Sequence, residues 1–226
     1  MDGSQSLGFE SWIVLIFDHF QSIESPSNYD IPWDYEAEPE LVLSYLTRLF
    51  ENAGALLTPY TDPQVSNGLE YLVSPNFSNY MFVLQDTNIA MEKRIRCIEA
   101  FYYLFSTFFA VRCENEIRGT LLEKIRSLCW KCYTWYDLIP IHANWVSDAS
   151  QPEFNDAMLA VMQKTLSVSH PLCQKGGLHG LGLWHYTYPE RVERIIDQFI
   201  AEFPNISDDV RNYAQQARRG YVRDWH

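Results

Sequence analysis

Apolar residues recur every three or four positions along most of the chain, and this periodicity limits the fold more than any other feature. Near the N-terminus they stand at offsets of 0, 3, 4, 7, 8 and 11 residues: Phe9, Trp12, Ile13, Ile16, Phe17 and Phe20. This spacing places all six side chains on one face of a helix. The alternation of period two that marks half-buried strands is essentially absent. The sequence therefore predicts an all-α protein.

The same periodicity, together with proline and capping signals, predicts about ten helical segments with short links. We expect them near residues 7–22, 39–54, 62–73, 77–84, 88–112, 114–136, 157–166, 171–185, 189–203 and 207–220. The segments 88–112 and 114–136 are expected to be the most buried helices. Residues 138–152 are expected to form an irregular connection.

Neighbouring helices of similar length predict a stack of helical hairpins. We expect 171–185 to pair with 189–203, and 88–112 with 114–136, and stacked hairpins of this kind form α-helical solenoids. A clean repeat period is not visible in the sequence. No linker divides the chain, so we predict one domain over residues 1–226, with an acidic part at 1–92 and HEAT-like helices at 153–220.

Three stretches resemble a family of bacterial proteins without an assigned activity. They are Leu178-His179-Gly180-Leu181-Gly182-Leu183-Trp184-His185 with the following Tyr188–Val192, residues 49–57, and the opening residues 9–19. The resemblance implies a HEAT-like α-α superhelix in a bacterial cytosol and supplies no activity. The chain departs from the family's pattern at Lys175-Gly176-Gly177, where the family has a small residue after its cysteine and acid.

Charge is distributed unevenly along the chain. Residues 1–92 hold 14 acidic residues and one basic residue, whereas residues 93–226 hold 15 acidic and 16 basic residues, and the net charge is −12. Such a charge argues against nucleic acid and against an anionic membrane as partners. The densest acidic run is Asp34, Glu36, Glu38 and Glu40. It is either a solvated loop leading into a helix N-terminus or a docking surface for a basic protein.

The N-terminal sequence and the number of cysteines indicate the cellular compartment that we expect. The first 20 residues lack a basic region and a small-residue cleavage site, so no signal peptide is expected. The longest apolar stretch, residues 97–111, is shorter than the roughly 20 residues of a membrane-spanning helix. Five cysteines in a chain of this size indicate reduced thiols without disulfides. We therefore expect a cytoplasmic protein.

Motifs for cofactors and metals are weak. Gly177, Gly180 and Gly182 lack the order and the preceding strand of a nucleotide-binding loop, so we interpret them as packing glycines. Cys129 and Cys132 are expected to be core thiols. His170, Cys173, His179 and His185 lie close together in sequence, but His170 and His185 would be about 22 Å apart along a continuous helix. We predict neither a cofactor nor a four-ligand zinc site, although a two-ligand contribution completed elsewhere stays open.

One aromatic and polar cluster marks a candidate pocket. The cluster consists of Trp184, His185, Tyr186 and Tyr188 at a turn between two predicted helices, with His179 nearby. Such turns often expose functional groups in solenoids. The other interpretation is that these side chains cap and pack the hairpin. No pattern of a nucleophile with its base is present, so no catalytic residue is assigned.

Two functions follow as hypotheses. The first is a non-enzymatic protein–protein interaction domain with an acidic docking surface. Its most specific form is an immunity or antitoxin protein against a basic nuclease, since complementary charge raises association rates. The alternative is an enzyme or small-ligand-binding protein with a pocket near Trp184 and His185.

Overall fold

The computed structural model describes residues 7–18, 38–141 and 152–222. The α-helices in this part are α1 (Phe9–Phe17), α2 (Pro39–Glu51), α3 (Ala53–Leu56), α4 (Asp62–Val73), α5 (Met91–Tyr103), α6 (Ala110–Arg112), α7 (Leu121–Arg126), α8 (Leu128–Leu138), α9 (Pro152–Thr165), α10 (Pro171–Trp184), α11 (Pro189–Glu202) and α12 (Asp208–Ala217). A 3₁₀ turn, η1 (Tyr80–Leu84), precedes α5, and a π-helical segment, η2 (Leu104–Phe109), joins α5 to α6. The described residues contain no strand, which confirms the all-α prediction.

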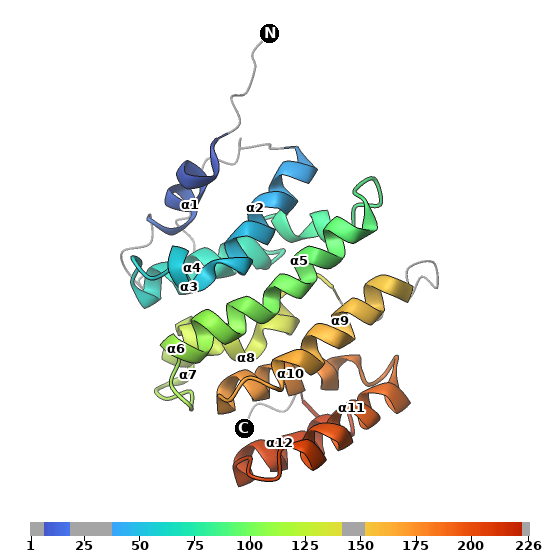
Figure 1. The fold of residues 1–226 in the computed structure, drawn as a ribbon. Coiled ribbons are helices and arrows are strands. Elements are labelled where there is room, and N and C mark those ends of the chain that lie inside the picture. The colour runs from blue at the N-terminus through green and yellow to red at the C-terminus, as the bar shows by residue number, and fades with distance from the viewer. Residues whose placement is uncertain (1–6, 19–37, 142–151, 223–226) are drawn as a thin grey trace.

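The helices stack in two layers from the N-terminal to the C-terminal end of the molecule (Figure 1). In one layer α2 packs against α5, and α5 packs against α9. In the other, α4, α8, α10 and α12 follow one another. α10 contacts α11 as predicted, but its most extensive contacts are with α8. The finer assignment to a HEAT-like superhelix stays a prediction.

Aromatic side chains fill the space between the layers. Trp135 of α8 is fully buried, and its ring meets Phe50 of α2 edge-on at 5.5 Å and Phe101 of α5 at 5.6 Å. Such edge-to-face pairs add about 0.5–1.5 kcal/mol each beyond the area that they bury. This cluster joins three helices that are distant in sequence.

Small residues let α10 approach α8 closely. A Cβ atom on Gly180 would lie 2.8 Å from the ring of Tyr136, and one on Gly176 would lie 2.6 Å from the carbonyl oxygen of Cys132. A Cβ atom on Gly182 would similarly lie 2.3 Å from Val222. The interpretation of Gly180 and Gly182 as packing glycines is thereby confirmed.

The predicted single helix over residues 114–136 is wrong. Gly119 adopts φ = +103°, and Thr120 begins α7 with a capping box to Glu123. Ser127 then interrupts the helix a second time. As the N-cap of α8, its side chain accepts a hydrogen bond from the backbone N–H of Trp130. These local signals override the apolar spacing, because capped turns supply hydrogen bonds that a continuous helix would otherwise provide.

The expectation that this whole segment is buried is also wrong. Leu121, Leu122 and Ile125 are 67%, 57% and 38% exposed, and α7 contains no buried residue. Only from Leu128 onward, in α8, does the apolar face enter the core. Among the described helices, none is long and apolar enough to cross a membrane.

Candidate functional site

The acidic run predicted as a docking surface is described only in part. Asp34 and Glu36 lie outside the described residues. Glu38 is the exposed N-cap residue of α2, and Glu40 in the first turn forms an exposed ion pair with Lys93 of α5. The hydrogen bond from Lys93 to Glu40 raises the pKa of the lysine. Carboxylates at this position also suit the positive end of the α2 dipole.

Other acidic residues of the N-terminal part pair with basic residues from later helices. Arg96 of α5 donates two hydrogen bonds to Glu51, at 2.8 and 3.1 Å. Lys131 of α8 pairs with Glu70 of α4 at 3.0 Å. Part of the negative charge of the N-terminal segment is thus neutralised by ion pairs within the fold. Fewer unpaired carboxylates face solvent than the charge count of the sequence suggests.

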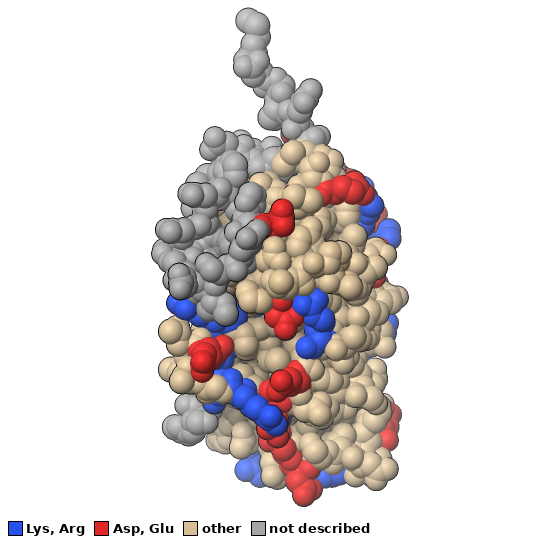
Figure 2. Space-filling view, turned by 90° about the vertical axis from the view of Figure 1, so that its left-hand side faces the viewer, with Lys and Arg blue, Asp and Glu red and all other residues tan. Residues whose placement is uncertain are grey.

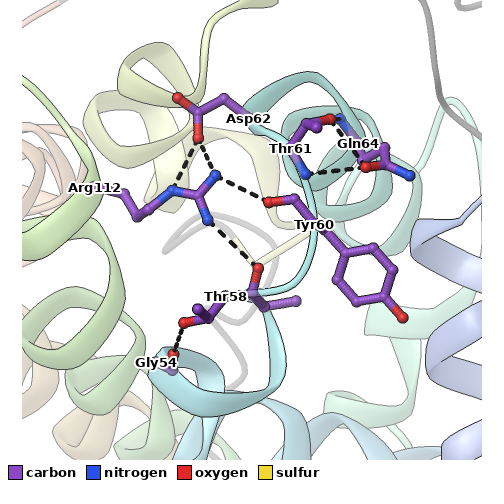
Figure 3. A network of polar contacts seen from close by, with 8 residues as sticks. Gly54, Thr58, Tyr60, Thr61, Asp62, Gln64 and Arg112 are labelled. Atoms are coloured by element: carbon purple, nitrogen blue, oxygen red, sulfur yellow. Dashed lines mark hydrogen bonds and ion pairs between the residues drawn. The ribbon is translucent and has the colours of Figure 1, made fainter.

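Arg112 makes a further link of this kind at the end of α6 (Figure 3). Its guanidinium donates to the carboxylate of Asp62 and to the carbonyl oxygen of Tyr60, the latter at 3.0 Å. Thr61, between these two residues, is the N-cap of α4 and forms a capping box with Gln64. Arg112 therefore holds α6 against the loop that begins α4.

A depression of about 380 Å³ lies next to this link. It is lined by Asp62, Pro63, Arg112, Glu114, Glu116, Arg118, Glu123, Arg126, Ser127, Leu128 and Cys129. The lining includes three arginines and four carboxylates, so it has no dominant sign. Figure 2 looks onto the side that carries α6 and α7 and shows basic and acidic side chains interleaved.

Helix α7 borders this depression and is held to the protein by polar contacts. The Lys131 Nζ atom donates to the carbonyl oxygen of Ile125 at 3.0 Å, and the Ser66 hydroxyl donates to the carbonyl oxygen of Arg126 at 2.8 Å. Both contacts satisfy carbonyl groups at the C-terminal end of the helix. The backbone of α7 is thus fixed while the apolar side chains of Leu121 and Leu122 face outward.

Four of the five cysteines gather beneath the depression. We call Cys113, Cys129, Cys132 and Cys173 the thiol cluster; they come from the end of α6, from α8 and from α10. The Sγ atoms of Cys132 and Cys173 are 3.8 Å apart. Hydrogen bonds from Cys129 and then Cys132 lower the pKa of Cys113, against the opposing effect of burial.

His170 contacts the backbones of two residues of the thiol cluster. Its Nε2 atom lies 3.1 Å from the carbonyl oxygen of Cys113, and its Nδ1 atom accepts from the backbone N–H of Cys173 at 3.4 Å. Across residues 7–18, 38–141 and 152–222, no three His, Cys, Asp or Glu side chains are arranged to hold a metal ion. Sequence reasoning singled out Cys129 and Cys132 but did not place Cys132 beside Cys173, because this contact forms only where α8 packs against α10.

The four residues of the predicted pocket are divided between core and surface. His179 is buried with Nδ1 at 2.8 Å from the Tyr213 hydroxyl, and Trp184 is buried and stacked on Tyr188 at 5.9 Å. His185 and the 86% exposed Tyr186 line a separate depression of about 410 Å³ together with Arg219 and Gly220. The four side chains therefore do not line one common cavity.

Comparisons with known proteins give no assignment for this arrangement. No protein-family model matches the chain, and no curated protein or solved structure is significantly similar to it. The resemblance to a bacterial family stays a prediction, and the function rests on the physical properties of the sites above.

Proposed function

We propose that this chain is a non-enzymatic protein–protein interaction domain and that a partner protein binds to the outward side of α7. We call Leu121, Leu122 and Ile125 the α7 surface. The observation that carries the proposal is the exposure of these three neighbouring aliphatic side chains on one short helix. Fully burying such a side chain stabilises a complex by about 1.5–3 kcal/mol.

The surroundings of the α7 surface support the proposal. Arg118, Glu123 and Arg126 line the adjacent depression and flank the apolar side chains. Protein–protein interfaces commonly have this composition, with an apolar centre and a charged rim. Several charges of both signs would let the rim select among partners.

The attachment of α7 also supports the proposal. Lys131 and Ser66 hold its last carbonyl groups, and the capping box of Thr120 with Glu123 holds its first turn. A helix that is ordered before binding loses little conformational entropy when a partner docks. The contacts at both ends of α7 thus support a binding helix that is already formed before the partner docks.

For the class of partner we retain a basic protein. The net charge of −12 raises the rate at which a basic protein approaches. Glu38 is exposed and available for such steering, whereas Glu40 is paired with Lys93. An immunity or antitoxin protein that binds a basic toxin is the specific form of this proposal. Localisation in the cytoplasm is part of it.

The test starts from crosslinking. A photoreactive amino acid at position 122 is used to trap a partner, which is then purified, and binding is measured by calorimetry. We expect Leu121→Asp/Leu122→Asp to weaken binding at least tenfold. Val14→Asp is the matched control, because Val14 is 50% exposed on a different helix, α1, at the N-terminal end of the stack. Equal losses in both variants, or none in the α7 variant, would contradict the proposal.

Charge-reversal substitutions distinguish electrostatic steering of the partner from its binding to the α7 surface. Replacing Asp34, Glu36, Glu38 and Glu40 with lysine is expected to slow association roughly tenfold and to change dissociation little. If the lysine variant instead associates as fast as the parent chain, the prediction of an acidic docking surface is wrong, even if the partner binds the α7 surface.

The alternative function, a ligand pocket near Trp184 and His185, has less support. Trp184 and His179 are buried, and only His185 and Tyr186 reach the nearby depression. Loss of binding or of a detected activity in His185→Ala/Tyr186→Ala, with the α7 variant unaffected, would favour this alternative.

A further inference from the structure

Helices α9 and α11 are joined near their N-terminal ends and leave an opening near their C-terminal ends. An ion pair between Arg191 and Asp156 makes the link. Toward the other ends lie two depressions, of about 300 Å³ and about 340 Å³, and Glu202 and Phe203 line both of them. We call the larger one, lined by residues 169–171, 174 and 202–207, the link depression, because it lies between the α9–α10 link and the α11–α12 link.

Gln174 supplies a hydrogen-bond acceptor to the link depression. This residue is only 7% exposed, and its Nε2 atom donates to the carbonyl oxygen of Leu166 at 3.3 Å. A carbonyl oxygen can only accept, so this contact fixes which side of the amide carries the oxygen. The Oε1 atom therefore lies on the side away from Leu166, and it has no hydrogen-bond partner among the described residues. A ligand that donates here would satisfy a group that the fold leaves unpaired.

Glu202 supplies negative charge to the same depression. Its Oε1 atom accepts from the side-chain amide of Gln198 at 2.7 Å, whereas no described residue pairs with its Oε2 atom. The carbonyl groups in the last turn of α11 add the negative end of a helix dipole. Phe203, the next residue, brings a partly buried aromatic ring to the lining. The link depression thus offers acceptor oxygens, one of them charged, beside a ring.

The cationic groups of the chain do not fill this depression. No lysine or arginine is among the described residues that line it. Arg211 lies at its edge and donates to the carbonyl oxygen of Pro204 at 2.7 Å. His170 accepts through Nδ1 from the backbone N–H of Cys173, and its Nε2 atom lies 3.1 Å from the carbonyl oxygen of Cys113. With Nδ1 as an acceptor the imidazole ring is neutral.

We propose that the link depression binds the guanidinium group of an arginine side chain that another protein presents. A guanidinium group is planar, always charged and carries five N–H donors, so it suits the acceptors of Gln174 and Glu202 and also stacks on an aromatic ring such as Phe203. The neighbouring depression has the buried side chains of Leu166 and Phe199 in its lining. Such apolar surface suits the aliphatic stem of arginine.

The link depression is separate from the α7 surface but close to the end of α6. None of its lining residues belongs to α7, and His170 in its lining contacts Cys113, the residue that follows α6. A basic partner on the α7 surface would thus find an arginine site on the adjoining part of the protein, a consequence that rests on the proposed function. The binding of an isolated arginine derivative does not rest on it, so the two proposals fail separately.

The test is an NMR titration of the isotope-labelled full chain with Nα-acetyl-arginine N-methylamide, which holds the side chain between two peptide groups. The titration is made at pH 8, because a hydrogen bond with Cys173 raises the pKa of His170 and a protonated ring would repel the probe. We expect saturable shifts of the Gln174 side-chain amide and of the backbone N–H groups of Asn205 and Ser207. Nα-acetyl-norleucine N-methylamide, which lacks the guanidinium group, is expected to cause no such shifts.

Matched variants locate the site. Glu202→Gln removes a charge from an exposed residue and should weaken binding roughly threefold or more. Gln174→Met removes the acceptor and should have a similar effect. Glu190→Gln is the control, because it removes the same charge from the exposed first turn of the same helix. Thermal melting followed by circular dichroism checks that each variant is folded, and if Gln174→Met is not, Glu202→Gln decides alone.

Several outcomes would overturn the assignment. They are equal weakening in Glu190→Gln, unchanged binding in Glu202→Gln, equal binding of the norleucine derivative, and the absence of saturable shifts at a millimolar concentration of the probe. Free arginine distinguishes the source of the guanidinium group. If free arginine binds more tightly than the capped derivative, the site takes a small molecule, and the assignment to a protein side chain is wrong.

Discussion

The side-chain nitrogen of Lys131 lies 3.0 Å from a carboxylate oxygen of Glu70, and this ion pair joins α8 to α4 inside the protein. Lys131 is 1% exposed and also donates to the carbonyl oxygen of Ile125. One buried lysine therefore connects two core helices and holds the end of α7.

Replacing Lys131 with methionine is expected to destabilise the protein by about 3 kcal/mol, because a largely buried Glu70 loses its partner. Urea denaturation measures the change. Lys93→Met is the matched control, since its pair with Glu40 is exposed on both sides and such surface pairs add little to stability. Similar losses in the two variants would contradict the prediction, and Lys131→Met/Glu70→Leu should recover part of the loss.

Gly176→Ala is expected to lower the free energy of unfolding by about 1–3 kcal/mol through overpacking. The new Cβ atom would lie 2.6 Å from the carbonyl oxygen of Cys132, a backbone atom that cannot rotate away. The direction of the change in stability is informative, because a Gly→Ala substitution in an uncrowded helix stabilises the protein by about 1 kcal/mol. A more stable variant in thermal denaturation would show that α8 and α10 do not pack this closely.

Leu122→Asp is expected to change stability by less than about 0.5 kcal/mol, as for most exposed positions. Leu128→Asp, six residues later, should cost about 4 kcal/mol or more, because it places an unpaired charge in the core at a side chain only 3% exposed. Thermal melting of the two variants compares them directly. If both melt like the parent chain, or both fail to fold, the described boundary between α7 and α8 is wrong.

Stability should fall as the pH rises above about 10. Burial raises the pKa of Tyr71 to about 12 and also raises those of Tyr133, Tyr136 and Tyr213. Above pH 10 the unfolded chain releases these protons while the folded chain keeps them, so each tyrosine removes about 1.4 kcal/mol per pH unit.

The pKa of Lys131, lowered by burial, acts in the opposite direction, but one lysine opposes four tyrosines. Urea denaturation between pH 8 and pH 11, with absorbance at 295 nm to follow phenolate formation, checks the prediction. A constant free energy of unfolding over this range would refute it.

The sequence by itself determined the helical class and many helix positions. The apolar stripes of α1, α2, α9 and α11 gave correct elements, since a stripe of period 3.6 must be buried by some neighbour whichever one it is. Pro171, Pro189 and Ser207 marked helix starts correctly because capping depends on adjacent residues alone. The packing role of Gly180 was also accessible from the sequence.

Tertiary structure alone decided which side chains meet. The apolar spacing of Leu121, Leu122 and Ile125 was misinterpreted as a buried stripe, because spacing defines a face but not whether another helix covers it. The approach of Cys132 to Cys173, and of Lys131 to Glu70, depends on how α4, α8 and α10 pack. These contacts join residues far apart in the chain, and no local propensity or periodicity encodes such distances.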